Sequence, residues 1–220
     1  MKLLLTSAGI SNDSIRKALV ELLGKPIAEA SAMFVPTAIY AYPNGGDIAR
    51  RVIRGLLGDP FCELGWKSLG VLELTALPSI KQEIWVPMLQ DTDALLVGGG
   101  DCQYLCYWMQ QSGLADLLPS LLRKTVYVGL SAGSMIMTSY GTTYGHHVLP
   151  PESPKSLGFV DFALHPHLDY PAFPNNSMAN LEKLAATLPM PSYAIDDQTA
   201  IKVVDGVVEV ISEGNWRLFP

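Results

Sequence analysis

The segment Thr125–Met137 constrains the fold of this chain more than any other. It opens with β-branched and aromatic residues typical of a strand, and Gly129-Leu130-Ser131-Ala132-Gly133 then leads into an apolar stretch that can continue as a helix. When a G-x-S-x-G motif lies between a strand and a helix, its glycines allow a tight turn that places the serine at the carboxyl end of a parallel sheet. This nucleophile elbow makes Ser131 the candidate nucleophile. The alternative is an ordinary glycine-rich turn.

The order of apolar segments predicts an α/β fold, because strand-like runs alternate with segments of helical spacing. We expect a parallel sheet with right-handed crossovers and helices on both faces. The expected strands are Lys2–Leu5, Ala32–Val35, Ser68–Leu74, Ala94–Val97, Thr125–Val128 and Phe159–Leu164, and the expected helices are Ile15–Leu23, Asp47–Leu57, Ile80–Leu89, Gln103–Gln111, Leu114–Lys124 and Asn175–Leu188. Short β runs within Ser192–Phe219 predict a small antiparallel C-terminal extension. No linker is visible, so residues 1–220 are expected to form a single domain.

Composition narrows the classes of partner. The net charge is −6 and there is no basic run, which argues against binding to nucleic acid. The apolar run Leu3-Leu4-Leu5 is too short for a signal sequence, and no run approaches membrane-spanning length. The three cysteines are odd in number and unpatterned, which favours reduced thiols. We therefore expect a cytoplasmic protein that binds neither nucleic acid nor a membrane.

Two further features of the sequence can support acyl chemistry at the same sheet edge as Ser131, because the carboxyl ends of parallel strands meet there. The strand Ala94–Val97 runs into Gly98-Gly99-Gly100, whose N–H groups can face a developing oxyanion beside the N–H of Ala132. A phosphate-binding or merely tight turn is the alternative, although no Walker sequence follows. The second feature is the group of histidines after the strand that ends near residue 164.

A serine hydroxyl needs an adjacent base, and all four histidines follow Ser131 in the chain. His165 and His167 lie at the end of an expected strand, and either suits the role. A carboxylate should hold the tautomer of that histidine, and spacing leaves five candidates open: Glu152, Asp161, Asp169, Asp196 and Asp197. His146 and His147 match no common metal-binding spacing, so we expect neither a metal nor a cofactor.

Three motifs together resemble the peptidase E (α-aspartyl dipeptidase) and cyanophycinase family of serine peptidases. They are Val97-Gly98-Gly99-Gly100-Asp101, Gly129-Leu130-Ser131-Ala132-Gly133 and Pro166-His167, and Asp196-Asp197-Gln198-Thr199-Ala200 is similar to a further family segment. The resemblance covers essentially the whole chain. It implies a parallel-sheet three-layer sandwich like the class I glutamine amidotransferase domain, with serine in place of that group's cysteine.

The resemblance also implies roles for individual residues. Ser131 matches the nucleophile and His167 the base, while Gly100 and Ala132 match the backbone donors of the oxyanion hole. Gly99 and Asp101 are then expected at the substrate; the dipeptidases commonly have asparagine at the position of Asp101.

The acidic member of the triad departs from the family pattern. The family usually places it in the loop between serine and histidine, where this chain has no carboxylate before Glu152. Asp169 is the first choice, because amidotransferase-like folds have a carboxylate two residues after the histidine. Asp197 is the next.

The predicted function is that of a serine peptidase that hydrolyses short peptides, in the manner of a dipeptidase, as a monomer or homodimer. Asp-X specificity is implied by the resemblance. However, the aspartyl dipeptidases hold the substrate carboxylate with an arginine, and residues 168–184 contain none. The alternatives are a non-catalytic or regulatory member of the same fold that binds a small ligand, and an esterase or other acyl hydrolase.

Overall fold

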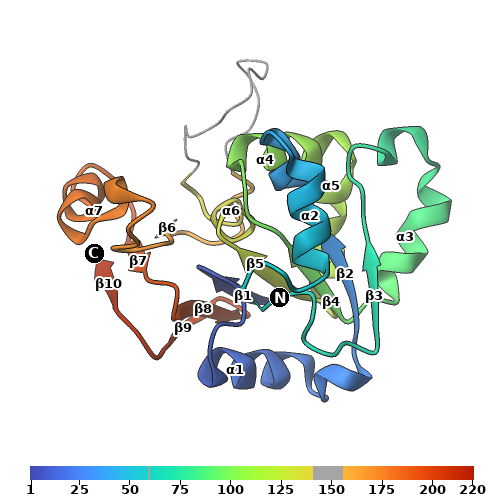
Figure 1. The fold of residues 1–220 in the computed structure, drawn as a ribbon, viewed down its shortest axis with the longest axis horizontal. Helices are drawn as coiled ribbons and strands as arrows, with labels where there is room; N and C mark the ends of the chain where they lie inside the picture. Colours follow the sequence, from blue (N-terminus) through green and yellow to red (C-terminus); the bar gives the residue numbers. More distant parts are fainter. Residues whose placement is uncertain (59, 141–155) are drawn as a thin grey trace.

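A computed structural model of the chain describes residues 1–58, 60–140 and 156–220 (Figure 1). Its centre is a seven-stranded sheet in the order β3-β2-β4-β5-β1-β8-β9. The five strands from β3 to β1 are parallel, and β8 and β9 continue the sheet in antiparallel pairing beyond β1. The bounds are β1 Lys2–Thr6, β2 Ser31–Val35, β3 Ser68–Val71, β4 Ala94–Val97, β5 Val126–Leu130, β8 Thr199–Val204 and β9 Val207–Ser212.

Helices cover both faces of this sheet. They are α1 Asp13–Leu23, α2 Gly45–Ile53, α3 Gln82–Gln90, α4 Cys102–Gln111, α5 Leu114–Leu121 and α6 Ala132–Met135. A further helix, α7 Met178–Ala185, packs away from this sheet, against Ala194 and Phe219. The short 3₁₀ turns are η1 Ile27–Glu29, η2 Thr37–Ala41, η3 Leu77–Ser79 and η4 Pro174–Asn176. Successive strand residues alternate between two cores. In β1, Leu4 packs with the apolar face of α1, whereas Leu3 and Leu5 pack in the cluster that contains α3, α4, α5 and α6.

A second sheet of three strands holds the C-terminal part of the chain. It consists of β6 Ala163–His165, β7 Ser192–Ile195 and β10 Trp216–Phe219 in the order β10-β7-β6, with β6 and β7 parallel and β10 antiparallel to β7. This sheet and α7 lie at the end of the molecule opposite to α3 (Figure 1). The predicted antiparallel tail is thus divided: β8 and β9 extend the main sheet, while β10 closes the small one.

Local sequence signals explain where most elements begin and end. The Asn12 side chain accepts a hydrogen bond from the N–H of Ile15 and caps α1, and Gly24 ends that helix in the left-handed region at φ 70°. Five predictions of bounds were wrong by three residues or more. The predicted helix at 114–124 ends at Leu121. The predicted helix at 47–57 ends at Ile53, and the predicted strand at 159–164 is reduced to β6. The strand predicted at 68–74 stops at Val71, and α7 is shorter than the predicted helix at 175–188.

In the described parts of the chain, no helix has both the length and the apolar composition needed to cross a lipid bilayer.

Candidate active site

Ser131 lies on a sharp turn between β5 and α6. Its backbone has φ 49° and ψ −110°, a strained conformation for a residue with a side chain and the one a nucleophile elbow requires. The turn presses against β4: a Cβ atom on Gly133 would lie 2.1 Å from the carbonyl oxygen of Val97, so only glycine fits. The carbonyl of Thr6 in β1 accepts from the N–H of Ser131 at 3.1 Å and from Ser134 Oγ at 2.8 Å.

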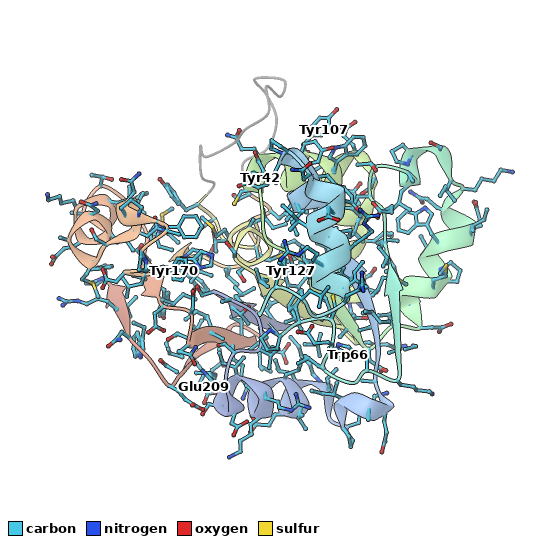
Figure 2. All side chains as sticks on the ribbon, viewed as in Figure 1. Tyr42, Trp66, Tyr107, Tyr127, Tyr170 and Glu209 are labelled. Atoms are coloured by element: carbon cyan, nitrogen blue, oxygen red, sulfur yellow. The ribbon has the colours of Figure 1, made fainter. Side chains whose placement is uncertain are left out.

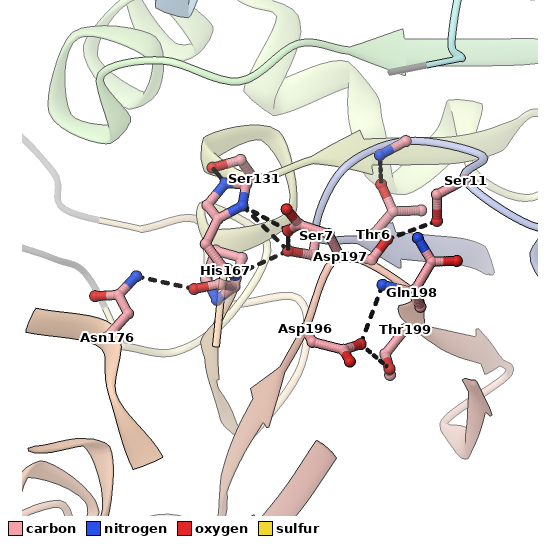
Figure 3. Close-up of polar contacts among 12 residues, drawn as sticks. Thr6, Ser7, Ser11, Ser131, His167, Asn176, Asp196, Asp197, Gln198 and Thr199 are labelled. Carbon is pink, nitrogen blue, oxygen red and sulfur yellow. Dashed lines mark hydrogen bonds and ion pairs between the residues drawn. The ribbon is translucent and has the colours of Figure 1, made fainter. Parts of the chain in front are cut away.

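The side chains of Ser131, His167 and Asp197 form a continuous chain of contacts (Figure 3). His167 Nε2 lies 3.0 Å from Ser131 Oγ, and His167 Nδ1 lies 2.7 Å from Asp197 Oδ1. Ser131 follows β5, His167 follows β6 by two residues, and Asp197 lies between β7 and β8. The carboxyl ends of strands from both sheets therefore meet at this point.

The charge of Asp197 determines the tautomer of His167. Burial alone would raise the pKa of the Asp197 carboxyl, but hydrogen bonds from His167 and Ser7 outweigh burial and hold this pKa below its ordinary value. An ionised carboxylate only accepts hydrogen bonds, so Nδ1 of His167 carries the proton that faces it. Nε2 then has a free lone pair, which can accept the hydroxyl proton of Ser131.

Ser7 is a member of this network that the sequence analysis did not identify. Its Oγ donates to Asp197 Oδ1 at 2.6 Å and accepts from the backbone N–H of His167 at 2.8 Å, and the residue is fully buried. The signal was available, because Ser7 is a polar residue directly after the first parallel strand.

The structure does not place Asp169, the first choice for the acidic member of the triad, beside His167. Asp169 Oδ1 accepts from the N–H of Met178 at 2.9 Å, so this carboxylate caps the start of α7, and the carboxylate bonded to His167 is that of Asp197. The reason is the backbone: both His167 (φ 58°) and Asp169 (φ 54°) are left-handed, so this segment is not an extended strand with both side chains on one face.

The other candidate acids fall elsewhere. Asp196 Oδ1 accepts from the N–H of Gln198 and from Thr199 Oγ1 and so stabilises the turn before β8. Asp161 is exposed on the segment before β6. Glu152, His146 and His147 lie outside the described residues.

His165 lies in the interior of the small sheet, where it contacts a neighbouring strand. It is buried in β6, its Nε2 lies 2.8 Å from Ser192 Oγ of β7, and burial lowers its pKa to about 4. It therefore stays neutral at pH 7 and bridges the two strands. Of the two histidines that spacing left open, His167 is the one that reaches Ser131.

The glycine loop after β4 lies against the elbow. A Cβ on Gly99 would lie 3.2 Å from Cβ of Ser131, and one on Gly100 (φ 139°) would overlap the backbone of Ala38 at 2.4 Å. The Gly100 backbone can adopt this conformation only because it has no side chain. On the other side of Ser131, the N–H of Ala132 begins α6, where the first N–H groups of a helix have no partner within it.

Asp101 was expected to contact the substrate, but its side chain is buried at the start of α4. Its side chain accepts from the N–H of Tyr104, caps α4 and is only 2% exposed. A carboxylate so buried and so engaged has little surface to offer a substrate. Within the described residues there is also no group of three or more His, Cys, Asp or Glu side chains arranged to hold a metal ion.

A serine on a strained strand–helix turn, an imidazole within hydrogen-bond reach of its hydroxyl and a half-buried carboxylate on the far side of that imidazole are together the geometry of a serine hydrolase. Comparison with known proteins identifies the family. Residues 3–211 match the profile of Peptidase family S51, and the chain belongs to that family.

Among curated relatives, Peptidase E of Shewanella putrefaciens is 28% identical over 138 residues, which is 60% of this chain and 58% of that protein's length. Peptidase E of Nostoc sp. is 24% identical over 139 residues, 60% of this chain and 57% of the relative. The matched region thus spans less than two thirds of each relative.

Solved structures agree on the fold. The crystal structure of a candidate Peptidase E protein from Listeria monocytogenes EGD-e has a TM-score of 0.68 at 19% identity and covers 97% of this chain and 98% of that one. At this identity the match shows the fold alone. It confirms the predicted α/β class with a mostly parallel sheet, like the class I glutamine amidotransferase domain.

Proposed function

We propose that this protein is a serine peptidase that cleaves short peptides, with Ser131 as nucleophile, His167 as general base and acid, and Asp197 as the carboxylate that orients the imidazole. The observation that carries the proposal is the pair of distances at His167: 3.0 Å from Nε2 to Ser131 Oγ, and 2.7 Å from Nδ1 to Asp197 Oδ1. Both are within hydrogen-bond reach without any movement of the chain. Membership of a family of serine peptidases supports the same assignment.

The mechanism follows from the geometry. Ser131 Oγ attacks the peptide carbonyl carbon while its proton passes to Nε2 of His167, and the charge of Asp197 stabilises the imidazolium that forms. The N–H groups of Ala132 and Gly100 donate to the carbonyl oxygen as it becomes an oxyanion. His167 then gives the proton to the departing nitrogen, and the C–N bond breaks. A water molecule, deprotonated by His167, hydrolyses the acyl-enzyme and restores the serine.

Labelling with a fluorophosphonate probe tests whether Ser131 is an activated nucleophile. We expect rapid labelling of the wild type, with the modified peptide mapping to Ser131, and no labelling of Ser131→Ala. Ser139→Ala is the matched control, because Ser139 is an exposed serine eight residues away and its loss should change nothing. Labelling that persists in Ser131→Ala would contradict the assignment.

Turnover of short peptides tests the reaction itself. A panel of dipeptides and dipeptide amides, Asp-X included, should be hydrolysed by wild type and by Ser139→Ala, and not by Ser131→Ala. The folded state of each variant should be checked by its thermal unfolding midpoint. Hydrolysis of activated esters with no hydrolysis of any peptide would instead assign the protein as an acyl hydrolase, and the absence of any Ser131-dependent reaction would favour a ligand-binding role.

A further inference from the structure

Two aromatic side chains lie beside the catalytic imidazole with much of their surface in water. The Phe173 ring stacks on His167, with centroids 4.9 Å apart and an interplanar angle of 29°. Tyr170 lies 5.9 Å from Phe173 and 6.1 Å from His167. Phe173 is 46% exposed and Tyr170 is 45% exposed. We call Tyr170 and Phe173 the aromatic step; Tyr170 is labelled in Figure 2.

The backbone holds the aromatic step in place. The N–H of Tyr170 donates to the carbonyl of His167, that of Phe173 to Tyr170, and that of Asn176 to Phe173, at 3.2, 2.9 and 2.8 Å. The Asn176 side chain also donates to the carbonyl of Pro166 at 2.9 Å. Aromatic rings that the fold fixes at a reactive centre, rather than burying them, provide a preorganised apolar contact surface.

The role of His167 indicates which part of a substrate this surface faces. The imidazole must deliver its proton to the departing nitrogen, so it lies on the leaving-group side of the scissile bond. Groups packed around the same ring are therefore nearest to the residue that carries that nitrogen. The oxyanion donors Ala132 and Gly100 belong to other elements, α6 and the loop after β4.

We propose that the aromatic step forms a subsite for an aromatic or large apolar side chain on the residue immediately after the scissile bond. This inference rests on the proposed peptidase function and adds the class of substrate. Aromatic rings favour edge-to-face or offset contacts with a further ring, in addition to the apolar area that such contacts bury. Peptides of the form X-Phe, X-Tyr or X-Leu are then preferred over X-Ala.

The charged side chains around the site favour a substrate whose residue after the scissile bond has an uncharged side chain. The described loops that surround or support the site are residues 7–12, 36–44, 98–101, 131–140, 165–177 and 196–198, and within them there is no Lys or Arg. They do contain four carboxylates: Asp101, Asp169, Asp196 and Asp197. An acidic side chain after the scissile bond would meet negative charge with no cation among these residues to pair with it.

Dipeptide amides have no terminal carboxylate, so differences in kcat/KM among them report the effect of the side chain alone. We expect the wild type to cleave Ala-Phe-NH₂ with a kcat/KM about tenfold above that for Ala-Ala-NH₂, and Ala-Asp-NH₂ to be the poorest of the three. In Tyr170→Ala and Phe173→Ala the preference for Phe over Ala should fall about five- to tenfold, while Phe173→Tyr should retain it. Ile84→Ala is the control, since Ile84 is a 60% exposed apolar residue on the distant helix α3.

Equal losses for Ala-Phe-NH₂ and Ala-Ala-NH₂ would overturn the inference, because the rings would then only support the imidazole. A wild type with no preference for Phe would overturn it as well. Binding gives a readout that does not depend on turnover: phenylalaninamide should bind Ser131→Ala at least about fivefold more tightly than alaninamide does, and Tyr170→Ala in that background should remove the difference. Equal affinities would refute the aromatic subsite. The proposed peptidase function is tested separately, because it would be refuted by fluorophosphonate labelling that does not depend on Ser131.

Discussion

Replacement of Asp197 by asparagine keeps the shape of the side chain, removes its charge, and so isolates what the carboxylate does for His167. In the structure Asp197 Oδ1 accepts two hydrogen bonds, from His167 Nδ1 at 2.7 Å and from Ser7 Oγ at 2.6 Å. The NH₂ group of an asparagine facing Nδ1 would donate to it, and the imidazole would carry its proton on Nε2 instead. In that tautomer His167 cannot accept the proton of Ser131.

The expected loss follows from the charge of the pair in the transition state. Unit charges about 4 Å apart at an effective dielectric constant of about 20 attract by about 4 kcal/mol, which corresponds to about a thousandfold in rate. The wrong tautomer adds to this, since the equivalent substitution in a serine protease triad lowers kcat about 10⁴-fold. We therefore expect Asp197→Asn to lower kcat by about 10³- to 10⁴-fold, with KM changed by less than about threefold.

Asp169→Asn is the matched control, because asparagine also caps helices and can still accept from the N–H of Met178. Its kcat should stay within about twofold of the wild type. The assays are steady-state hydrolysis of a dipeptide amide and the rate of fluorophosphonate labelling, with thermal unfolding to show that both variants fold. A large loss in Asp169→Asn together with near-normal activity in Asp197→Asn would refute the assignment of the acid.

Three further perturbations have distinct expected outcomes. Ser7→Ala should lower kcat/KM about tenfold, because the Asp197 carboxylate loses a hydrogen bond that helps to hold its pKa below the ordinary value and the backbone N–H of His167 loses its acceptor; Ser7→Thr should restore kcat/KM. Gly133→Ala should destabilise the fold by about 2 kcal/mol or more in urea titrations, whereas Gly46→Ala, with open space around it, should not. Burial lowers the pKa of His165 to about 4 from the ordinary 6.5, so the unfolded chain binds more protons between these values. The free energy of unfolding should therefore fall by up to about 3 kcal/mol as the pH drops from 7 to 4, and His165→Gln should lack this loss.

The fold and the elbow could be predicted from the sequence because their signals are local. Strand, G-x-S-x-G and helix occur within Thr125–Met137, and the structure places Ser131 on the expected turn. The buried strands of the parallel sheet are short continuous apolar runs such as Ala94–Val97, which periodicity finds with nearly the correct bounds. Helix ends were less predictable: α2 stops at Ile53 although apolar residues continue beyond it.

The carboxylate that contacts His167 could not be chosen from the sequence, because its position depends on how two sheets meet. Asp169 is two residues from His167 in the chain, whereas Asp197 is thirty residues away and arrives through β7 and the turn before β8. Separation in sequence says nothing about which carboxylate faces Nδ1 when the backbone at His167 and Asp169 is left-handed. That conformation is rare for residues other than glycine, and no pattern in the segment predicts it.

β1 shows why Ser131 and Asp197, the proposed nucleophile and acid, lie close together although they come from distant parts of the chain. It lies between β5, which leads to Ser131, and β8, which follows Asp197. Its last residue, Thr6, accepts from the N–H of Ser131 through its carbonyl, and the next residue, Ser7, binds Asp197 and the backbone of His167. Two consecutive residues at the end of one strand thus fix the elbow on one side and the base and acid on the other. The distance between Ser131 and Asp197 is therefore set by strand spacing in the sheet, which accounts for the contact of both side chains with His167.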